Sequence, residues 1–189
     1  MVVLLSNRPI GQSLPNSYVL PPDRRPGIVN VPIGKDIPVI DFQSIADPDD
    51  RVEIVQQILK ACQEFGLFQV INHGVSRTLI DEAMSVLNEF FCTTPTEYKA
   101  EVVGIYSVEV RKFLLMILNL LCEGLGIEQG HFEGNLSKTQ LLYVNHHIPC
   151  LDPSTTLGHF EHYDSNLITT LYQCDVSSLL DNLYCIKNK

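Results

Sequence analysis

Residues 157–173, LGHFEHYDSNLITTLYQ, combine a His-x-Asp pair with a run of strand-forming residues. The pair is His162 and Asp164, and the run at 167–172 predicts a β-strand. Residues two apart on a strand point to the same face, so we expect His162 and Asp164 to project together. One imidazole and one carboxylate on a common face make up two-thirds of the facial triad that binds non-haem Fe(II). The same pair also occurs by chance as a surface polar pair, and only the rest of the chain decides between these interpretations.

The composition indicates one globular domain and argues against several classes of partner. The 189 residues are 45% hydrophobic and 19% charged, which is ordinary for a globular protein with a sizeable core. A formal net charge of −9 argues against nucleic acid or an anionic membrane as a partner. The longest apolar run, 113–118, is far shorter than the roughly 20 residues of a membrane span. The six cysteines form no C-x-x-C pair, and this scattered spacing is typical of reduced thiols. We therefore expect a cytoplasmic location.

The N-terminal third predicts an arm, a strand and a helix. Residues 1–36 are rich in proline, and we expect an extended arm with little regular structure. A short strand follows at 37–41. A helix is then expected to begin with Asp47 as its cap and Pro48 at its first position, and to end at Gly66. Its apolar face is predicted from side chains that recur at spacings of three and four, namely Val52, Val55, Ile58, Leu59, Cys62 and Phe65.

A second strand and two further helix starts come next. The strand is predicted at 67–72, and His73 and Gly74 then turn the chain, with His73 in a structural role. Ser76 is expected to cap a second helix. The sequence TPTE at 94–97 is a capping box, which predicts the start of a third helix.

The second half changes from helix to strand patterning. Residues 106–123 are helical in pattern and apolar almost all round, which is typical of a buried helix, and Gly124 and Gly126 are expected to close it. Strands are predicted at 140–147 and again at 167–172. Helices in the first part and strands in the second predict the α+β class.

Four stretches stand out in order along the chain: IPVIDF (37–42), ACQEFGLFQVINHGVS (61–76), LLYVNHHIPCLDPSTTLG (141–158) and HYDSNLITTLYQCD (162–175). Together they resemble the plant iron(II)- and 2-oxoglutarate-dependent dioxygenases. Two shorter stretches, SVEVRK (107–112) and CEGLGI (122–127), are similar to the hyoscyamine hydroxylase/epoxidase branch of that family.

The resemblance implies a fold and an activity. The fold is an N-terminal helical region followed by a double-stranded β-helix, or jelly roll. The activity is oxidation of a small molecule, such as an alkaloid or another specialised metabolite, coupled to decarboxylation of 2-oxoglutarate to succinate. Fe(II) is the implied metal, with ascorbate in support. The implied regions are an extended arm (1–36), an N-terminal dioxygenase region (37–100) and a partial dioxygenase core (101–189).

The resemblance also assigns candidate site residues. His162 and Asp164 match the first two iron ligands of the family. Asn145 and His147 share a strand face and are candidate contacts to 2-oxoglutarate, although the family usually has a tyrosine where His147 stands. A histidine there can still donate a hydrogen bond. The alternative, that His146 and His147 are ordinary strand residues, stays open.

Two departures from the family pattern qualify these expectations. Family members carry a long segment after the third helix, whereas here EYK at 97–99 runs almost directly into SVEV at 107–110. The sequence also ends 25 residues after Asp164, before the family's second iron histidine and the Arg-x-Ser that holds 2-oxoglutarate. We therefore expect an internally deleted, C-terminally truncated relative with an incomplete jelly roll, weak iron binding and little turnover.

Three functions compete at this point. The first is an oxygenase of the resembled family, and the second is a catalytically inactive paralogue or splice product. The third, an unrelated β-sandwich binding module, does not explain the motifs together. Strand edges exposed by an incomplete jelly roll also predict self-association of the chain.

Overall fold

The computed structural model describes residues 14–25, 37–90, 97–145, 151–152, 154–156, 164–172 and 184–185. These residues fall into two compact units. The smaller unit comprises Met1–Ile33 and Val144–His162, and the larger unit comprises Gly34–Tyr143 and Tyr163–Lys189.

The larger unit begins with a parallel pair of short strands joined by a helix. Strand β1 (Val39–Asp41) pairs with β2 (Gln69–Ile71), and helix α1 (Pro48–Glu64) makes the crossover between them. The register sets Ile40 opposite Val70, and both side chains are buried. The strands predicted at 37–41 and 67–72 are therefore present, with shorter bounds.

Helix α1 begins and ends at the residues that its capping signals predict. The Asp47 carboxylate accepts hydrogen bonds from the backbone N–H groups of Asp49 and Asp50, at 3.0 and 3.4 Å, and Pro48 is the first helical residue. Gly66 follows the helix at φ +70°, a conformation that favours glycine, and its N–H donates to the carbonyl of Ala61.

The buried face of α1 is turned relative to the predicted one, since it includes Ile54 and Ala61, which we did not predict. Val52 and Phe65, which we expected to be buried, are exposed. At 100° per residue Val52 lies roughly 120° away from the centre of the buried face, and Phe65 lies beyond the last helical turn. The buried residues of the helix are Ile54, Val55, Ile58, Ala61 and Cys62.

The remaining helices are α2 (Arg77–Phe90) and α3 (Glu97–Leu125). The Ser76 hydroxyl accepts a long hydrogen bond, 3.5 Å, from the N–H of Leu79 at the start of α2. Helix α3 is one continuous helix of 29 residues, although the sequence indicated two helices with a break between them, one starting at the capping box of 94–97 and one over 106–123.

That break is absent because the side chains on either side of it are buried. Gly104 costs about 1 kcal/mol in a helix interior. Val102 and Tyr106 flank it and pack against α2, which holds the helix together through this point. The helix contains Gly124, the first of the two glycines that we expected to close it, and ends at Leu125, directly before the second, Gly126, where φ is +66°. The predicted division between residues 100 and 101 thus lies inside a helix, and it stays a prediction.

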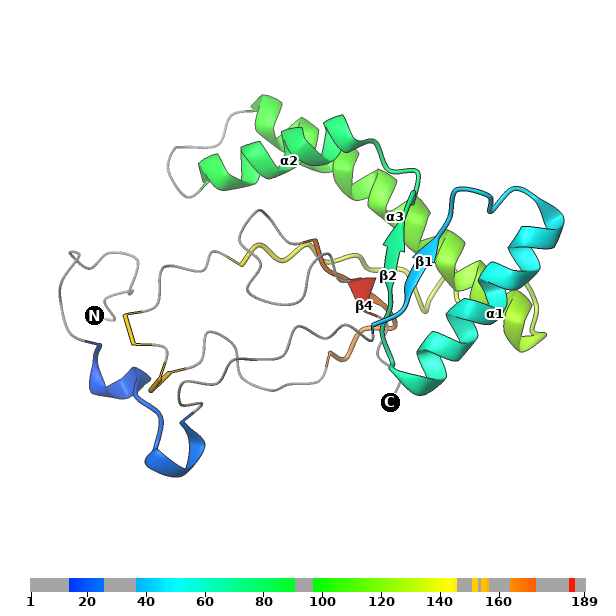
Figure 1. Cartoon of the computed structure of the whole chain (residues 1–189). Coiled ribbons are helices and arrows are strands. Elements are labelled where there is room, and N and C mark those ends of the chain that lie inside the picture. Colours follow the sequence, from blue (N-terminus) through cyan, green and yellow to red (C-terminus); the bar gives the residue numbers. More distant parts are fainter. Residues whose placement is uncertain are drawn as a thin grey trace. The chain divides into compact units, whose positions relative to one another are not determined.

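Helix α3 contributes to both hydrophobic clusters of the larger unit. Figure 1 shows α2 along the first half of α3 and α1 across its second half. The first cluster joins α2 to α3 through Ile80, Ala83, Val102 and Tyr106. The second joins α1 and both strands to α3, and its largest fully buried members are Ile40, Ile58, Phe68, Ile117 and Leu120.

The C-terminal strands are shorter than predicted, and one is absent. Residues 140–145 form no strand, and 146–147 lie outside the described residues. A strand needs a neighbour for its backbone hydrogen bonds, and no described segment pairs with 140–145. Of the run 167–172, strand β3 comprises Thr169–Thr170 and pairs antiparallel with β4 (Tyr184–Cys185). The mixture of helices and strands agrees with the α+β class, whereas the jelly roll stays a prediction.

The smaller unit contains part of the predicted arm. Its described residues include two short 3-10 helices, η2 (Asn16–Tyr18) and η3 (Pro22–Arg24). Between them the N–H of Leu20 donates to the carbonyl of Thr155 at 2.9 Å, and the Leu20 side chain is buried. The arm is therefore attached to the loop at 151–156.

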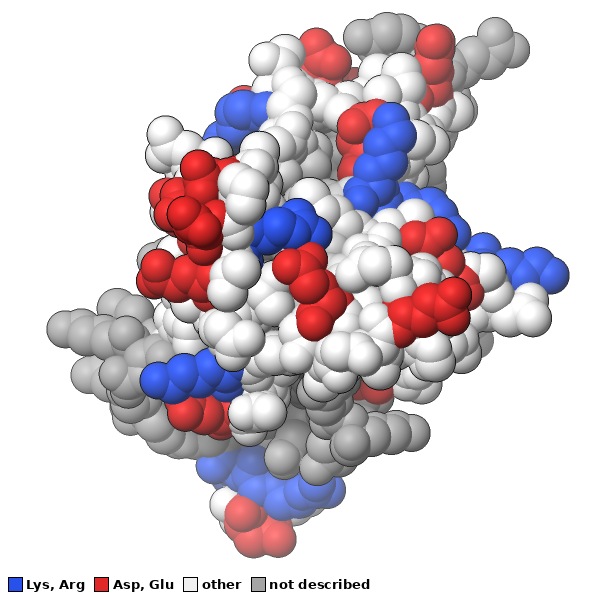
Figure 2. Space-filling view, turned by 90° about the vertical axis from the view of Figure 1, so that its right-hand side faces the viewer, with Lys and Arg blue, Asp and Glu red and all other residues white. Residues whose placement is uncertain are grey.

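None of the described helices combines the length and apolar character that crossing a bilayer requires. Figure 2 shows one face of the molecule, on which Asp and Glu side chains are interspersed with Lys and Arg. The described part of this face has no continuous basic surface of the kind that binds nucleic acid.

The two glycines of α3 allow a matched test of how closely α1 packs on it. A Cβ added at Gly124 would lie 2.7 Å from Leu59 Cδ1 and 2.8 Å from Val55 Cγ1, whereas one added at Gly104 meets nothing within 4 Å. We expect Gly104→Ala to stabilise the fold by about 0.5–1 kcal/mol, because alanine favours the helix. We expect Gly124→Ala to destabilise it by roughly 1 kcal/mol, because overpacking outweighs that gain. Urea unfolding measures both, and equal effects of the two substitutions would show that the helices do not touch at Gly124.

Candidate functional site

The structure describes two of the four predicted site residues. Asp164 is half-buried and lies in the larger unit, five residues before β3, and Ile168 between them packs against the second hydrophobic cluster. Asn145 is exposed and belongs to the smaller unit. His162 and His147 lie outside the described residues, so the predicted metal pair and the predicted 2-oxoglutarate pair both stay predictions.

Strand β3, which follows Asp164 in the sequence, contains two hydroxyl groups without a hydrogen-bond partner among the described residues. The hydroxyl oxygens of Thr169 and Thr170, in β3, are buried, and no partner is found for them among the described residues. A buried hydroxyl in that state costs about 1–3 kcal/mol. The described ranges also contain no group of three His, Cys, Asp or Glu residues that could hold a metal ion.

The Asn-His-Gly stretch forms a turn that is bonded back to β1. Asn72 has φ +52°, and its amide donates to the Asp41 carboxylate at 2.7 Å. The same carboxylate oxygen accepts from the N–H of Gln43 at 2.8 Å. Asp41 therefore joins the end of β1 to the turn after β2.

His73, within this turn, faces the core. Its ring centroid lies 5.6 Å from that of Phe113 on α3, and its Nδ1 accepts a hydrogen bond from the N–H of Val75. Burial lowers the pKa of His73 below its usual value. These contacts fit the structural role that the sequence predicted, and a neutral ring with an accepting Nδ1 suits them.

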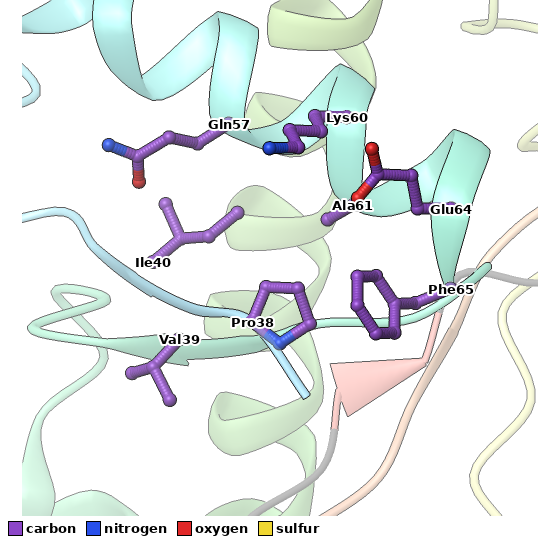
Figure 3. Close-up of a pocket in the computed structure, with 8 residues that line it drawn as sticks. All are labelled: Pro38, Val39, Ile40, Gln57, Lys60, Ala61, Glu64 and Phe65. Atoms are coloured by element: carbon purple, nitrogen blue, oxygen red, sulfur yellow. The ribbon is translucent and has the colours of Figure 1, made fainter. Parts of the chain in front are cut away.

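A surface pocket of about 310 Å³ lies between β1 and the C-terminal half of α1. Figure 3 shows side chains of α1 on one side of it and side chains of β1 on the other. None of the predicted site residues lines it. The sequence did not indicate this pocket, because its residue types are ordinary for a helix and a strand. The lining consists of Pro38, Val39, Ile40, Gln57, Lys60, Ala61, Glu64 and Phe65.

Comparison with protein families gives a match to part of the chain. The family described as non-haem dioxygenase in morphine synthesis, N-terminal, matches residues 37–113. The matched region contains β1, α1, β2 and α2 and ends within α3.

Several curated plant proteins are similar to the chain. Hyoscyamine 6-dioxygenase of Hyoscyamus niger is 36% identical over 86% of this chain and 63% of its own length. The Downy Mildew Resistance 6 protein of Arabidopsis thaliana is 32% identical over 85% of the chain and 62% of its own length. Mugineic-acid 3-dioxygenase of Hordeum vulgare is 30% identical over 84% of the chain and 60% of its own length. The chain thus spans less than two-thirds of the length of these relatives.

The lengths of these alignments carry further information. They extend over 224, 215 and 214 residues, each more than the 189 residues of the chain. Each relative therefore has residues inside the aligned region for which this chain has no counterpart. This agrees with the internal segment that we expected the chain to lack.

Among solved structures, the crystal structure of JOX2 in complex with 2OG, Fe and JA is similar to the chain. The superposition has a TM-score of 0.53, with 23% sequence identity, and covers 66% of this chain and 49% of JOX2. At this identity the likeness supports a shared fold over the superposed part.

The burial of His73 predicts a pH dependence of stability. Because its pKa is lower in the folded state, the unfolded chain binds the proton first as the pH falls below about 6.5. We expect the free energy of unfolding to fall more between pH 7.5 and 5 for the natural chain than for His73→Gln. Urea titrations across this range measure it, with the exposed His131→Gln as control. An identical pH slope for the natural chain and His73→Gln would contradict the burial of this ring.

Proposed function

Since the chain belongs, over the region it spans, to the plant family of iron(II)- and 2-oxoglutarate-dependent dioxygenases, we propose that it catalyses the oxidation of a small molecule. The oxidation is coupled to decarboxylation of 2-oxoglutarate to succinate. The observation that carries the proposal is the His-x-Asp pair ahead of β3 in a chain 36% identical to a named dioxygenase. The names of the similar proteins favour a specialised plant metabolite, such as an alkaloid, as the substrate class.

His162 and Asp164 are the proposed iron ligands. A neutral imidazole and a carboxylate are donors that suit Fe(II), and Asp164 is half-buried in the structure. Iron bound there would supply the activation of dioxygen, with ascorbate as a supporting reductant. Asn145 and His147 are the proposed contacts that orient 2-oxoglutarate, through an amide and a ring N–H.

The strands after residue 140 are proposed to belong to a jelly roll. The fold likeness to a structure that contains 2OG and Fe supports this, as does the antiparallel pairing of β3 with β4. The unmatched hydroxyls of Thr169 and Thr170 also fit strands that are built to meet further neighbours.

The second candidate is that the chain is a catalytically inactive member of the family. It is favoured by the alignments that exceed the length of the chain, because relatives hold an internal segment that this chain lacks. We place the missing segment at α3, where the sequence pattern predicted two helices and the structure has one. A continuous helix leaves no loop at that point to shape a substrate site.

Metal binding tests the assignment of the ligands. We expect the purified chain to bind Mn(II), used as a redox-stable substitute for Fe(II), weakly in anaerobic calorimetry, because the pair supplies only two protein ligands. We expect His162→Ala and Asp164→Ala each to abolish the binding. The exposed residues His131 and Asp23 provide matched controls, and their alanine variants should bind as the natural chain does. Binding that survives both ligand substitutions would refute the assignment.

Succinate formation separates the two candidate functions. In an assay with Fe(II), ascorbate and 2-oxoglutarate, succinate that accumulates and stops on Asp164→Ala supports the oxygenase. Metal binding that depends on Asp164, without formation of succinate, supports the catalytically inactive family member.

A further inference from the structure

Strand β1 pairs with β2 along one edge, and its other edge is open as far as the described residues show. Gln69 N–H donates to the carbonyl of Pro38 at 2.8 Å, and Phe42 N–H donates to the carbonyl of Ile71 at 3.0 Å. Backbone groups of successive strand residues alternate between the two edges, so those of Val39 and Asp41 face away from β2. No strand among the described residues pairs with that side of β1.

The pocket between β1 and α1 runs beside this open edge. Two large apolar side chains at the pocket, Val39 and Phe65, are 53% and 42% exposed. Figure 3 shows Pro38 and Phe65 on its strand side, below Lys60 and Glu64 of the helix. An open strand edge next to a helix, with apolar side chains between them, is the geometry in which an extended peptide adds a strand.

The same chain carries a segment of matching character at residues 141–143. Leu141, Leu142 and Tyr143 are 58%, 46% and 70% exposed, and they carry no charge. These residues favour a strand by their sequence pattern but lie in no ladder in the described structure.

The base of this segment is attached to α3. Gln140 Nε2 donates to the carbonyl of Ser107 at 2.9 Å, and Arg111 Nη2 donates to the carbonyl of Ser137 at 2.7 Å. The segment therefore starts from a defined point on the larger unit and presents its apolar side chains to solvent.

We propose that residues 141–143 of one copy of this chain add as a strand to the open edge of β1 in a second copy. The described part of each chain carries both the acceptor edge, on β1, and the donor segment, 141–143. Any second copy of the chain can therefore supply the donor. The groove is flanked by one positive side chain, Lys60, and one negative side chain, Glu64. The donor segment carries no charge, so neither of them would face a side chain of like charge in the complex. The contact joins two different surfaces, so it is heterologous. Each bound copy still presents a free donor or acceptor, and further copies can add to the assembly.

Lysine substitutions test the two surfaces separately, since a lysine on a strand edge opposes pairing. We expect the sedimentation coefficient of the natural chain to rise with concentration, and Val39→Lys and Leu141→Lys each to remove that rise. The matched controls are Val108→Lys and Val52→Lys, at side chains 53% and 59% exposed on α3 and α1, and both should associate as the natural chain does.

A mixture of the two interface variants tests the direction of the contact. Val39→Lys keeps its donor and Leu141→Lys keeps its acceptor, so an equimolar mixture should form a complex of two chains and no larger species. Formation of that complex also shows that both variants are folded. The proposal is overturned if the natural chain is a monomer at every concentration, or if the controls lose association as the interface variants do. It is also overturned if two monomeric variants fail to combine, because the segment then pairs within its own chain or with a different partner.

Discussion

The packing of α1 against α3 is the contact on which the larger unit depends. The two helices approach so closely at Gly124 that a side chain there would overlap Leu59 and Val55. An ion pair of 2.8 Å between Arg51 and Glu123 spans the same crossing, but both side chains are about one-third exposed, and such pairs contribute less than about 1 kcal/mol. Apolar contact therefore holds the crossing, and it places β1 and β2 on the same core.

Local signals in the sequence predicted the helix starts and failed where distant parts of the chain decide the structure. The Asp47 cap, the terminal Gly66 and the Ser76 cap are each read within a few residues, and each lies where expected. The break expected in α3 is absent because packing on α2 outweighs a single glycine. The strand expected at 140–147 depends on a neighbouring strand, which no local pattern supplies, and no described strand pairs with residues 140–145.

The candidate site, like the fold, could be predicted only in part. Its residue types could be predicted, because His-x-Asp is a compact motif whose chemistry follows from the donors themselves. Its geometry stays a prediction, since His162 lies outside the described residues and only Asp164 of the pair is described. The groove beside β1 was missed for a different reason. It lies beside an edge of β1 that no described strand pairs with, and residue types such as Val39 or Lys60 give no sequence signal for such an edge.

The continuity of α3 has a consequence for how the larger unit unfolds. At 1.5 Å per residue the helix is about 43 Å long, with Val102 and Tyr106 in one cluster and Phe113, Ile117 and Leu120 in the other. Helix formation is cooperative, so disorder in one half frays the hydrogen-bonded turns that support the other. The two clusters are thus mechanically coupled through a single backbone. The larger unit is expected to open as one cooperative unit, without an intermediate that keeps one cluster and loses the other.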